Sequence, residues 1–304
     1  MEIKAELHSH NIYSNFHLGK DESPYDCNIS FMEQLERSKE LGLNALFVTN
    51  HNTLDGYAQL LRYKNDHDKF KEIQIYPAEE VTIDSGSHVL VYGIHQEIKS
   101  GISLEEVIDE VKKQNGVTSA PHPFGILNAV RDNAKKCDMI EVFNSNNVDV
   151  ISNAKAIQFA DENNMIGVAG SDSHVLSTFG RCVNMLETEN NLDDILYSMK
   201  HNQISIHQTG YAKQSEIMEH LKYKMNNSKD YVTEYINEKH PNSKWLFSLL
   251  IKMYNHNPDS YLWFLFYRIA FLFMKRISKK INFQNLDSSF MKDRNLLTIF
   301  KMAI

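Results

Sequence analysis

Two histidines stand one residue apart near the start of the chain, in the stretch AELHSHNIYSN at residues 5–15. They follow an alternating apolar run, Ile3, Ala5 and Leu7, which is typical of a β-strand. Side chains at positions i and i+2 of a strand project to the same face, so His8 and His10 aim their imidazoles together. Such a pair is a clamp for a metal ion, although two solvated surface histidines would satisfy the pattern as well.

Further polar side chains recur at one place, the carboxyl end of a predicted strand. They are His51 after NALFVTN, Glu80 in IQIYPAEEVTI, His122 in VTSAPHPFG, and Asp172 and His174 in IGVAGSDSH. His88 opens its strand, SHVLVYGI, so we expect it to reach the same face from a loop or an antiparallel return. Histidines with unrelated surface roles would not be expected to recur at the carboxyl ends of successive strands. The pattern therefore favours a metal centre.

Predicted helices separate these strands. SFMEQLERSKELGL and SLEEVIDEVKKQNG each begin with a capping box, in which Ser30 precedes Glu33 and Ser103 precedes Glu106. VISNAKAIQFADENN is a third helical stretch. Alternating strands and helices predict an α/β fold with a parallel sheet or barrel, in which side chains at the carboxyl ends of the strands converge on one face.

The motifs ELHSHNIYS, FVTNHNTLDG, PAEEVTI with SHVLVYGI, SAPHPFG, IEVFN and AGSDSH resemble, in order and spacing, those of the PHP (polymerase and histidinol phosphatase) superfamily. The resemblance covers about residues 1–210. It implies a distorted (β/α)7 barrel with a trinuclear metal site and metal-dependent hydrolysis of phosphoesters. We therefore expect a PHP phosphoesterase domain at residues 1–210 and a basic, aromatic-rich helical extension at residues 211–304.

The resemblance also implies which residues bind metal. His8, His10, Glu80 and Asp172 match the ligands of one ion, His51 and His174 those of a second, and His88 and His122, with Glu80 bridging, those of a third. Glu79, next to the bridge, would point to the opposite side of its strand.

Two departures from the family's motifs concern the second ion. Asn50 stands where the family usually has the aspartate of TDH, and Asn15 stands where an aspartate or histidine ligand is expected. Asparagine is a poor ligand for a transition metal. His17 is a candidate replacement if its loop turns inward. The second ion is thus the one that we expect to be weakly bound or absent.

The ligand set suits Zn²⁺, Mn²⁺ or iron, and we expect two or three divalent ions. A metal-bound water, whose pKa falls from about 15.7 toward 7, would supply hydroxide to attack the phosphoester. Asp172 and His174 are therefore candidate catalytic residues as well as ligands. Arg181 in STFGRC is a candidate to grip the phosphate, with Lys20 as a second, although Arg181 would equally suit a pair with a local carboxylate.

The predicted function is a phosphohydrolase, with nucleotides or nucleic-acid 5′ ends as expected substrates, as in 5′–3′ exonucleases or nucleotide phosphatases. A small phosphomonoester such as histidinol phosphate is the alternative. Two other classes stay open. A metal-dependent amidohydrolase normally has a lysine at the bridging position, where this chain has Glu80, and a degenerate, non-catalytic module is supported only by Asn15 and Asn50. The sequence contains no G-x-S-x-G elbow, Walker A loop or GxGxxG motif.

Composition and charge limit which cellular compartment and which partners we expect for the protein. The chain has 304 residues, of which 42% are hydrophobic and 23% charged, an ordinary soluble composition. Cys27, Cys137 and Cys182 form no CxxC motif and no secretory signal is visible, so we expect a cytoplasmic protein. The net charge of −7 is uneven, with −14 on residues 1–210 and +7 on residues 211–304.

The basic segment contains SYLWFLFYRIAFLFMKRISKK at residues 260–280. Arg268 interrupts its apolar run, which is too short for a membrane span of about 20 residues. A helix that is apolar nearly all round is usually buried, so we expect a helical subdomain from about residue 211 that packs on itself or on a second copy. The alternative is contact with nucleic acid or with an anionic membrane surface, which the four cations Lys275, Arg276, Lys279 and Lys280 would favour.

Overall fold

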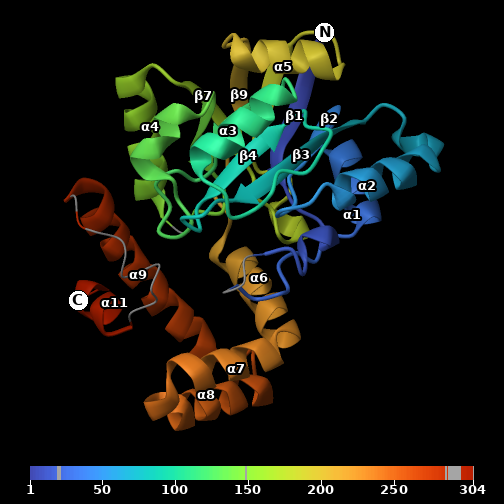
Figure 1. The fold of residues 1–304 in the computed structure, drawn as a ribbon. Coiled ribbons are helices and arrows are strands. Elements are labelled where there is room, and N and C mark those ends of the chain that lie inside the picture. The colour runs from blue at the N-terminus through green and yellow to red at the C-terminus, as the bar shows by residue number, and fades with distance from the viewer. Residues whose placement is uncertain (19–21, 148, 285, 287–295, 304) are drawn as a thin grey trace.

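The structure is a computed structural model that describes residues 1–18, 22–147, 149–284, 286 and 296–303. Its centre is a mixed sheet with the strand order β7-β6-β5-β4-β3-β2-β1-β8-β9. The strands are β1 (Glu2–Ser9), β2 (Ala45–Val48), β3 (Gln74–Thr82), β4 (His88–Tyr92), β5 (Val117–Ala120), β6 (Met139–Asn144), β7 (Ile166–Gly170), β8 (Val183–Glu187) and β9 (Ile204–Gln208). Figure 1 shows helices around this sheet and a helical extension beyond one end of it.

Strands β1 to β7 curl into a nearly closed barrel. β4 runs antiparallel to β3 and β5, and the other neighbours within β1–β7 pair in parallel. The two ends meet where Ser9 bridges Ser173 and where the Asn184 side chain bonds to the backbone N–H and C=O of Ala169, at 3.0 and 2.7 Å. β8 and β9 continue the sheet from β1 as antiparallel strands. The predicted α/β barrel is confirmed.

Helices cover the outside and one end of the barrel. They are α1 (Phe31–Glu40), α2 (Asp55–Asn65), α3 (Leu104–Lys113), α4 (Val150–Asn163) and α5 (Leu192–Lys200), with 3₁₀ turns η1 (Ile12–Ser14), η2 (Asp68–Phe70), η3 (Arg131–Lys136) and η4 (Leu176–Thr178). Ser30 and Ser103 form the predicted capping boxes. α5 lies across the amino-terminal end of the barrel (Figure 1), where Ile195 and Met199 join the buried interior. The carboxyl ends of the strands are thereby left for polar residues.

Alternating residues sort the core into an inner layer and outer layers. Phe47, Leu90 and Tyr92 fill the barrel interior. Their neighbours on the same strands face outward, where residues such as Leu46 pack under α1 and α2 and residues such as Val91 pack under α3 and α4. The period of two along each strand produces both layers.

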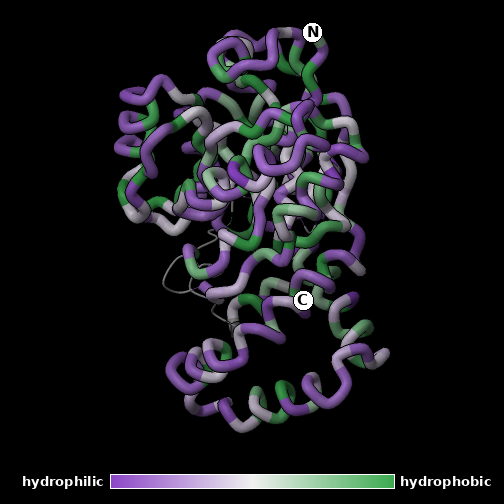
Figure 2. The backbone as a smooth tube through the Cα atoms, turned by 90° about the vertical axis from the view of Figure 1, so that its right-hand side faces the viewer, coloured by the Kyte–Doolittle hydropathy of each residue, from purple (hydrophilic) through white to green (hydrophobic). Residues whose placement is uncertain are grey.

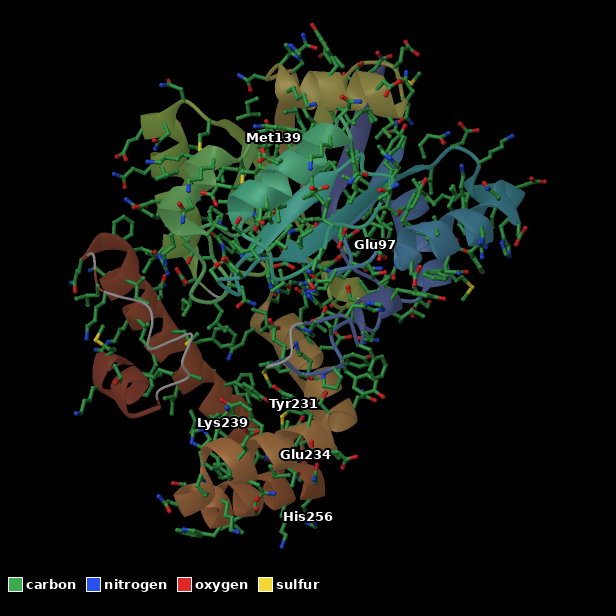
Figure 3. All side chains as sticks on the ribbon, in the orientation of Figure 1. Glu97, Met139, Tyr231, Glu234, Lys239 and His256 are labelled. Carbon is green, nitrogen blue, oxygen red and sulfur yellow. The ribbon has the colours of Figure 1, made fainter. Side chains whose placement is uncertain are left out.

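The extension is helical, as the sequence predicts. It contains α6 (Gln214–Asn227), α7 (Lys229–Lys239), η5 (Pro241–Ser243), α8 (Lys244–His256), α9 (Tyr261–Phe283) and α11 (Leu296–Ala303). α6 lies below the carboxyl ends of the strands, and α9 packs along α4 (Figure 1). In Figure 3, Glu234, Lys239 and His256 of α7 and α8 lie at the end of the molecule farthest from the barrel, whereas Met139 of β6 lies within the barrel.

The two halves of α9 differ in burial. In its second half Ile277 and Ile281 are buried, and the Ser278 hydroxyl donates to Asp149 Oδ1 at 3.0 Å. In its first half Trp263 packs against Tyr254 of α8, but most other large apolar side chains are exposed. Within the described part of the chain, the extension therefore does not bury the first half of α9 by packing on itself. Figure 2 accordingly shows hydrophobic stretches in the extension as well as in the barrel. Among the described helices, none is long and apolar enough to cross a membrane.

Candidate metal centre

A register shift in β1 turns both early histidines into the barrel. The pairing of β1 with β2 slips between Glu6 and Ser9. Such an irregularity re-aims the side chains that come after it. As a result His8 and His10 reach the interior that Ala5 and Leu7 also occupy, at the carboxyl end of the strand.

Four buried side chains place one ligand atom each around a common point. His8 Nε2 lies 3.3 Å from His10 Nε2, 3.3 Å from Glu80 Oε2 and 3.4 Å from Asp172 Oδ1. His10 Nε2 lies 3.2 Å from Glu80 Oε2 and 3.4 Å from Asp172 Oδ1. A tetrahedron with metal–ligand distances of about 2.0–2.1 Å has edges of about 3.3–3.4 Å, so these atoms fit one transition-metal ion. They belong to the four residues that the resemblance assigns to one ion.

A second group adds a carboxylate that the sequence did not reveal. Ligand atoms of His10, Asp26, His51 and His174 lie within 4.8 Å of one another, and all four residues are buried. Asp26 Oδ2 lies 3.1 Å from His174 Nε2 and 3.6 Å from His51 Nε2. Asp26 thus provides the acidic oxygen that was missing at Asn15 and Asn50.

Asn15 and Asn50 hold the loops that carry these residues. Asn15 Oδ1 accepts hydrogen bonds from the backbone N–H groups of Asp26 and Cys27, at 2.6 and 3.0 Å. Asn50 Oδ1 accepts from the Ser14 hydroxyl at 3.1 Å, which leaves Ser14 Oγ to accept from His10 Nδ1 at 3.0 Å. Each asparagine therefore has a structural role in holding a loop that carries site residues.

A third group forms on the other side of Glu80. Its members are His51, Glu80 and His88, and His122 lies beside them with Nε2 3.2 Å from Glu80 Oε1. His88 Nδ1 lies 2.9 Å from the same oxygen. His88 opens the antiparallel strand β4, which confirms that it reaches the site by an antiparallel return. Since Glu80 belongs to two of the three groups, it is placed to bridge two ions.

Outer contacts fix how the imidazoles point. Glu141 Oε1 accepts from His8 Nδ1 at 2.8 Å, and the backbone C=O of Asp172 accepts from His174 Nδ1 at 2.9 Å. In both histidines Nε2 is thereby left to face the cluster, as in most protein metal sites. Gly170 is necessary here, because a Cβ at that position would lie 1.8 Å from Glu141 Oε1.

The electrostatics of the cluster favour ionised carboxylates. Burial alone would raise the pKa of Asp172, but the charge on His8 and a hydrogen bond from His10 hold it well below its usual value. The pKa of Glu80 is likewise lowered, against the effect of burial, above all by the charges on His88 and His8. Burial lowers the pKa of His51 to about 3, so this imidazole is neutral and keeps a lone pair for a metal.

Three buried polar atoms test whether the site suits a cation. Within the described ranges, Asp26 Oδ2, His51 Nδ1 and His88 Nε2 make no hydrogen bond. An unsatisfied buried acceptor is costly, and native proteins seldom tolerate one without a bound ion or water. All three atoms belong to residues of the second or third group. The residues therefore fit divalent metal ions.

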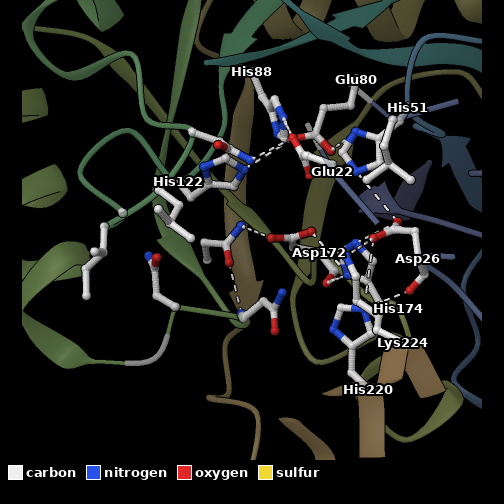
Figure 4. Close-up of a pocket in the computed structure, with 18 of the residues that line it drawn as sticks. Glu22, Asp26, His51, Glu80, His88, His122, Asp172, His174, His220 and Lys224 are labelled. Atoms are coloured by element: carbon white, nitrogen blue, oxygen red, sulfur yellow. Dashed lines mark hydrogen bonds and ion pairs between the residues drawn. The ribbon is translucent and has the colours of Figure 1, made fainter. Parts of the chain in front are cut away.

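The cluster forms one wall of a pocket of about 290 Å³. Figure 4 shows that His220 and Lys224 of α6 enter this pocket beside Asp26 and His174. The His220 ring stacks on that of His174 with centroids 4.5 Å apart, and Lys224 Nζ lies 3.3 Å from Asp26 Oδ1. The extension thus contributes side chains to a site that the sequence placed wholly within residues 1–210.

Two predicted site residues lie elsewhere. The Arg181 guanidinium pairs with Glu216 at the start of α6, and Arg181 does not line the pocket. Among the described residues, no group of candidate ligands includes His17. Lys20 lies outside the described residues. Glu79 faces away from the site, as expected, and its Oε2 accepts from the Ile98 N–H at 3.1 Å.

Sequence reasoning missed Asp26, Glu22, His220 and Lys224. Asp26 and Glu22 belong to the loop after β1, where no strand phase marks them. His220 and Lys224 are separated from Asp26, which both contact, by nearly 200 positions in the sequence. The polar residues of DESPYDCN, at residues 21–28, are the signal in the sequence that could have indicated this loop as part of the site.

Comparisons with known proteins agree with this geometry. The PHP-associated family model (PHP_C) matches residues 150–204, and this match confirms the resemblance to the PHP superfamily. The uncharacterized protein MJ1587 of Methanocaldococcus jannaschii is 27% identical over 165 residues, which cover 51% of this chain and 90% of that protein.

Two solved structures align with this chain. PsfC from Pseudomonas syringae PB-5123 aligns with a TM-score of 0.52 and 18% identity, over 74% of this chain and 98% of its own. The lesion-specific endonuclease PfuEndoQ from Pyrococcus furiosus aligns with a TM-score of 0.49 and 15% identity, over 68% of this chain and 58% of its own. The alignment with PsfC shows a similar fold and nothing about substrate.

Proposed function

We propose that this protein is a metal-dependent phosphoesterase, a hydrolase that acts on phosphoester bonds. The observation that carries the proposal is the chain of three overlapping ligand groups, joined by the shared residues His10, His51 and Glu80, at the wall of a pocket. Divalent ions bound there would lower the pKa of a water molecule and neutralise phosphoryl oxygens.

The proposed ligands are taken from these groups. His8, His10, Glu80 and Asp172 would hold one ion, His51, His174 and Asp26 with His10 a second, and His88 and His122 with Glu80 a third. Zn²⁺, Mn²⁺ and iron all suit histidine with carboxylate ligands. The proposal therefore includes two or three ions and a second site completed by Asp26.

Lys224 takes the phosphate-binding role that was expected of Arg181. Its ammonium group lines the pocket beside Asp26, whereas the Arg181 guanidinium is occupied by Glu216. A lysine at that place would attract an anionic substrate to a pocket otherwise rich in carboxylates. We therefore keep the division near residue 210 as part of the proposal, with α6 of the extension completing the active site.

The proposed substrates are molecules with a terminal phosphate, including the 5′ phosphates of nucleotides and oligonucleotides. A pocket of about 290 Å³ is at the small end of the range for ligand sites, so it suits a phosphate with the sugar next to it. Asn144 and Asn147 line the same pocket and can bond to hydroxyl groups.

The test combines metal analysis with hydrolysis assays. Purified protein loaded with Zn²⁺, Mn²⁺ or Fe²⁺ is expected to bind at least two ions and to hydrolyse p-nitrophenyl phosphate, a nucleoside 5′-monophosphate or a 5′-phosphorylated oligonucleotide. Asp172→Ala is expected to remove activity, and Asp161→Ala on the exposed face of α4 is the matched control. Metal-loaded protein that cleaves none of these phosphoesters, or that cleaves only amide substrates, would refute the proposal.

A further inference from the structure

The extension presents an apolar surface that the barrel does not cover. On α8, exposed side chains recur every three or four residues at Leu246, Leu249, Leu250 and Met253, and Trp245 beside them is 68% exposed. In the part of the chain that the structure describes, nothing packs over this face. Contiguous apolar surface of this kind on a soluble domain marks an interaction site.

The outward face of α9 is also apolar along its first half and then becomes basic. Leu262, Leu265, Ile269 and Leu272 are exposed at helical spacing along its first three turns. The same spacing then reaches Arg276 and Lys279, so one face of a single helix passes from apolar to basic. The two helices meet where Tyr254 packs on Trp263, with ring centroids 5.5 Å apart.

From these observations we infer that the outward faces of α8 and α9 dock on an anionic lipid surface. Residues 241–284 contain seven lysines or arginines and one acidic residue, Asp259. Two copies packed through this face would bring like charges together, whereas an anionic bilayer offers both an apolar interior and the opposite charge. Charge complementarity therefore selects the membrane over a second copy.

The second half of α9 anchors this surface to the barrel. Asn282 donates to the Phe124 C=O at 3.1 Å and accepts from the Arg131 guanidinium at 2.9 Å. Ile277 and Ile281 are buried in the same contact. A bilayer bound to the first half would thus hold the catalytic domain close to the membrane, independently of any metal in the site.

Vesicle binding tests the inference on the full chain. We expect the protein to float with vesicles of phosphatidylcholine and phosphatidylserine, but not with phosphatidylcholine alone, and added salt should weaken the binding. The chain has two tryptophans, Trp263 of α9, which is already buried, and Trp245 of α8, which is exposed. Binding should therefore shift the tryptophan fluorescence to the blue through Trp245. Leu265→Glu with Ile269→Glu should weaken binding by at least about tenfold.

The matched control is Ile157→Glu on α4, an apolar residue of similar exposure on the barrel, which should bind vesicles like the unmodified protein. All variants should keep the same circular dichroism and metal content, because the changed side chains are exposed. Three results would overturn the inference: no binding to anionic vesicles, unchanged binding by the double variant, or a dimer in solution that the double variant dissociates. Binding of an oligonucleotide that persists in the double variant, with no vesicle binding, would assign the basic charge to nucleic acid instead.

Discussion

The barrel and the extension differ in which side chains they bury and which they expose. At the carboxyl ends of its strands the barrel buries carboxylates and imidazoles, such as Glu80 and His10, whose side chains are candidate ligands for a cation. In the extension, α8 and the first half of α9 leave leucines and aromatic rings in solvent. Each region is shaped for something that the chain itself does not supply. The barrel needs metal ions, and the extension needs an apolar and anionic surface.

The largest expected effect is on activity and bound metal, and it should distinguish His10 from His17 in the following loop. His10→Ala removes an atom common to two ligand groups, whereas His17→Ala removes a side chain outside all of them. Loss of a residue that merely orients a ligand costs about 10- to 100-fold, so His10→Ala should lower kcat/KM by more than about 100-fold and reduce bound metal. His17→Ala should change neither by more than about twofold. Equal effects in the two variants would mean that the metal centre is placed wrongly.

The same substitution should have very different effects on the stability of the two regions. Leu90→Ala opens a cavity inside the barrel and should lower the free energy of unfolding by about 2–5 kcal/mol. Leu265→Ala removes an exposed side chain and should change it by less than about 0.5 kcal/mol. Urea unfolding followed by circular dichroism measures both values.

Tryptophan fluorescence adds a second readout to that experiment, because Trp245 and Trp263 lie only in the extension. If the two regions fold as separate units, fluorescence and circular dichroism will show transitions at different urea concentrations. Coincident transitions, with a large cost for Leu265→Ala, would contradict the contrast between a packed barrel and an exposed helical face.

Local periodicity was enough to predict the regular parts of the barrel. The strand and helix order follows from the apolar periodicity, and Ser30 and Ser103 mark two helix starts by their capping boxes. The positions of the polar residues at strand ends indicate that they converge on one face, whereas the grouping of His8, His10, Glu80 and Asp172 around one ion came from the family resemblance. The approach of His88 from an antiparallel strand was also predictable, because the residue opens its apolar run.

Local periodicity could not reveal contacts made by irregular backbone. The register shift in β1 changes which face of the strand His8 occupies, and the sequence ELHSH contains no pattern that predicts this shift. Asp26 reaches the site because Asn15 fixes its loop, and Lys224 reaches it because α6 folds back over the barrel. The exposed face of α9 escaped prediction for a related reason, since an apolar sequence indicates burial but does not show what covers it.

Substitution of Lys224 tests whether the extension takes part in substrate binding at the barrel's pocket. Lys224→Gln removes the extension's charge from the pocket and should raise KM about tenfold, or about 1.4 kcal/mol, with a smaller change in kcat. Lys222→Gln is the matched control, because Lys222 lies on the same helix but pairs with Asp259 away from the pocket. Steady-state kinetics on one phosphomonoester give both constants. If the two variants behave alike, the extension takes no part in substrate binding.

The last effect concerns the cost of burying a carboxyl group in the barrel alone. Glu79 and Glu80 are neighbours on β3 but face opposite sides, and only Glu80 is surrounded by histidines. Burial raises the pKa of Glu79 to about 8, because its one hydrogen bond, from the Ile98 N–H, does not compensate for lost water. Glu79 therefore keeps its proton in the folded state at neutral pH.

This proton makes stability depend on pH in a definite direction. Above the ordinary glutamate pKa of about 4.5 and below about 8, the folded state binds a proton at Glu79 that the unfolded state has released, so the free energy of unfolding falls as pH rises. The slope from this group is about 1.4 kcal/mol per pH unit. Glu79→Gln keeps an acceptor for the Ile98 N–H without the titration, and urea unfolding at several pH values should show a flatter curve than that of the unmodified protein. Glu72→Gln, at an exposed position just before β3, should leave the slope unchanged. Parallel curves for Glu79→Gln and the unmodified protein would show that Glu79 is ionised in the fold, and that the barrel tolerates a buried charge even where no histidine balances it.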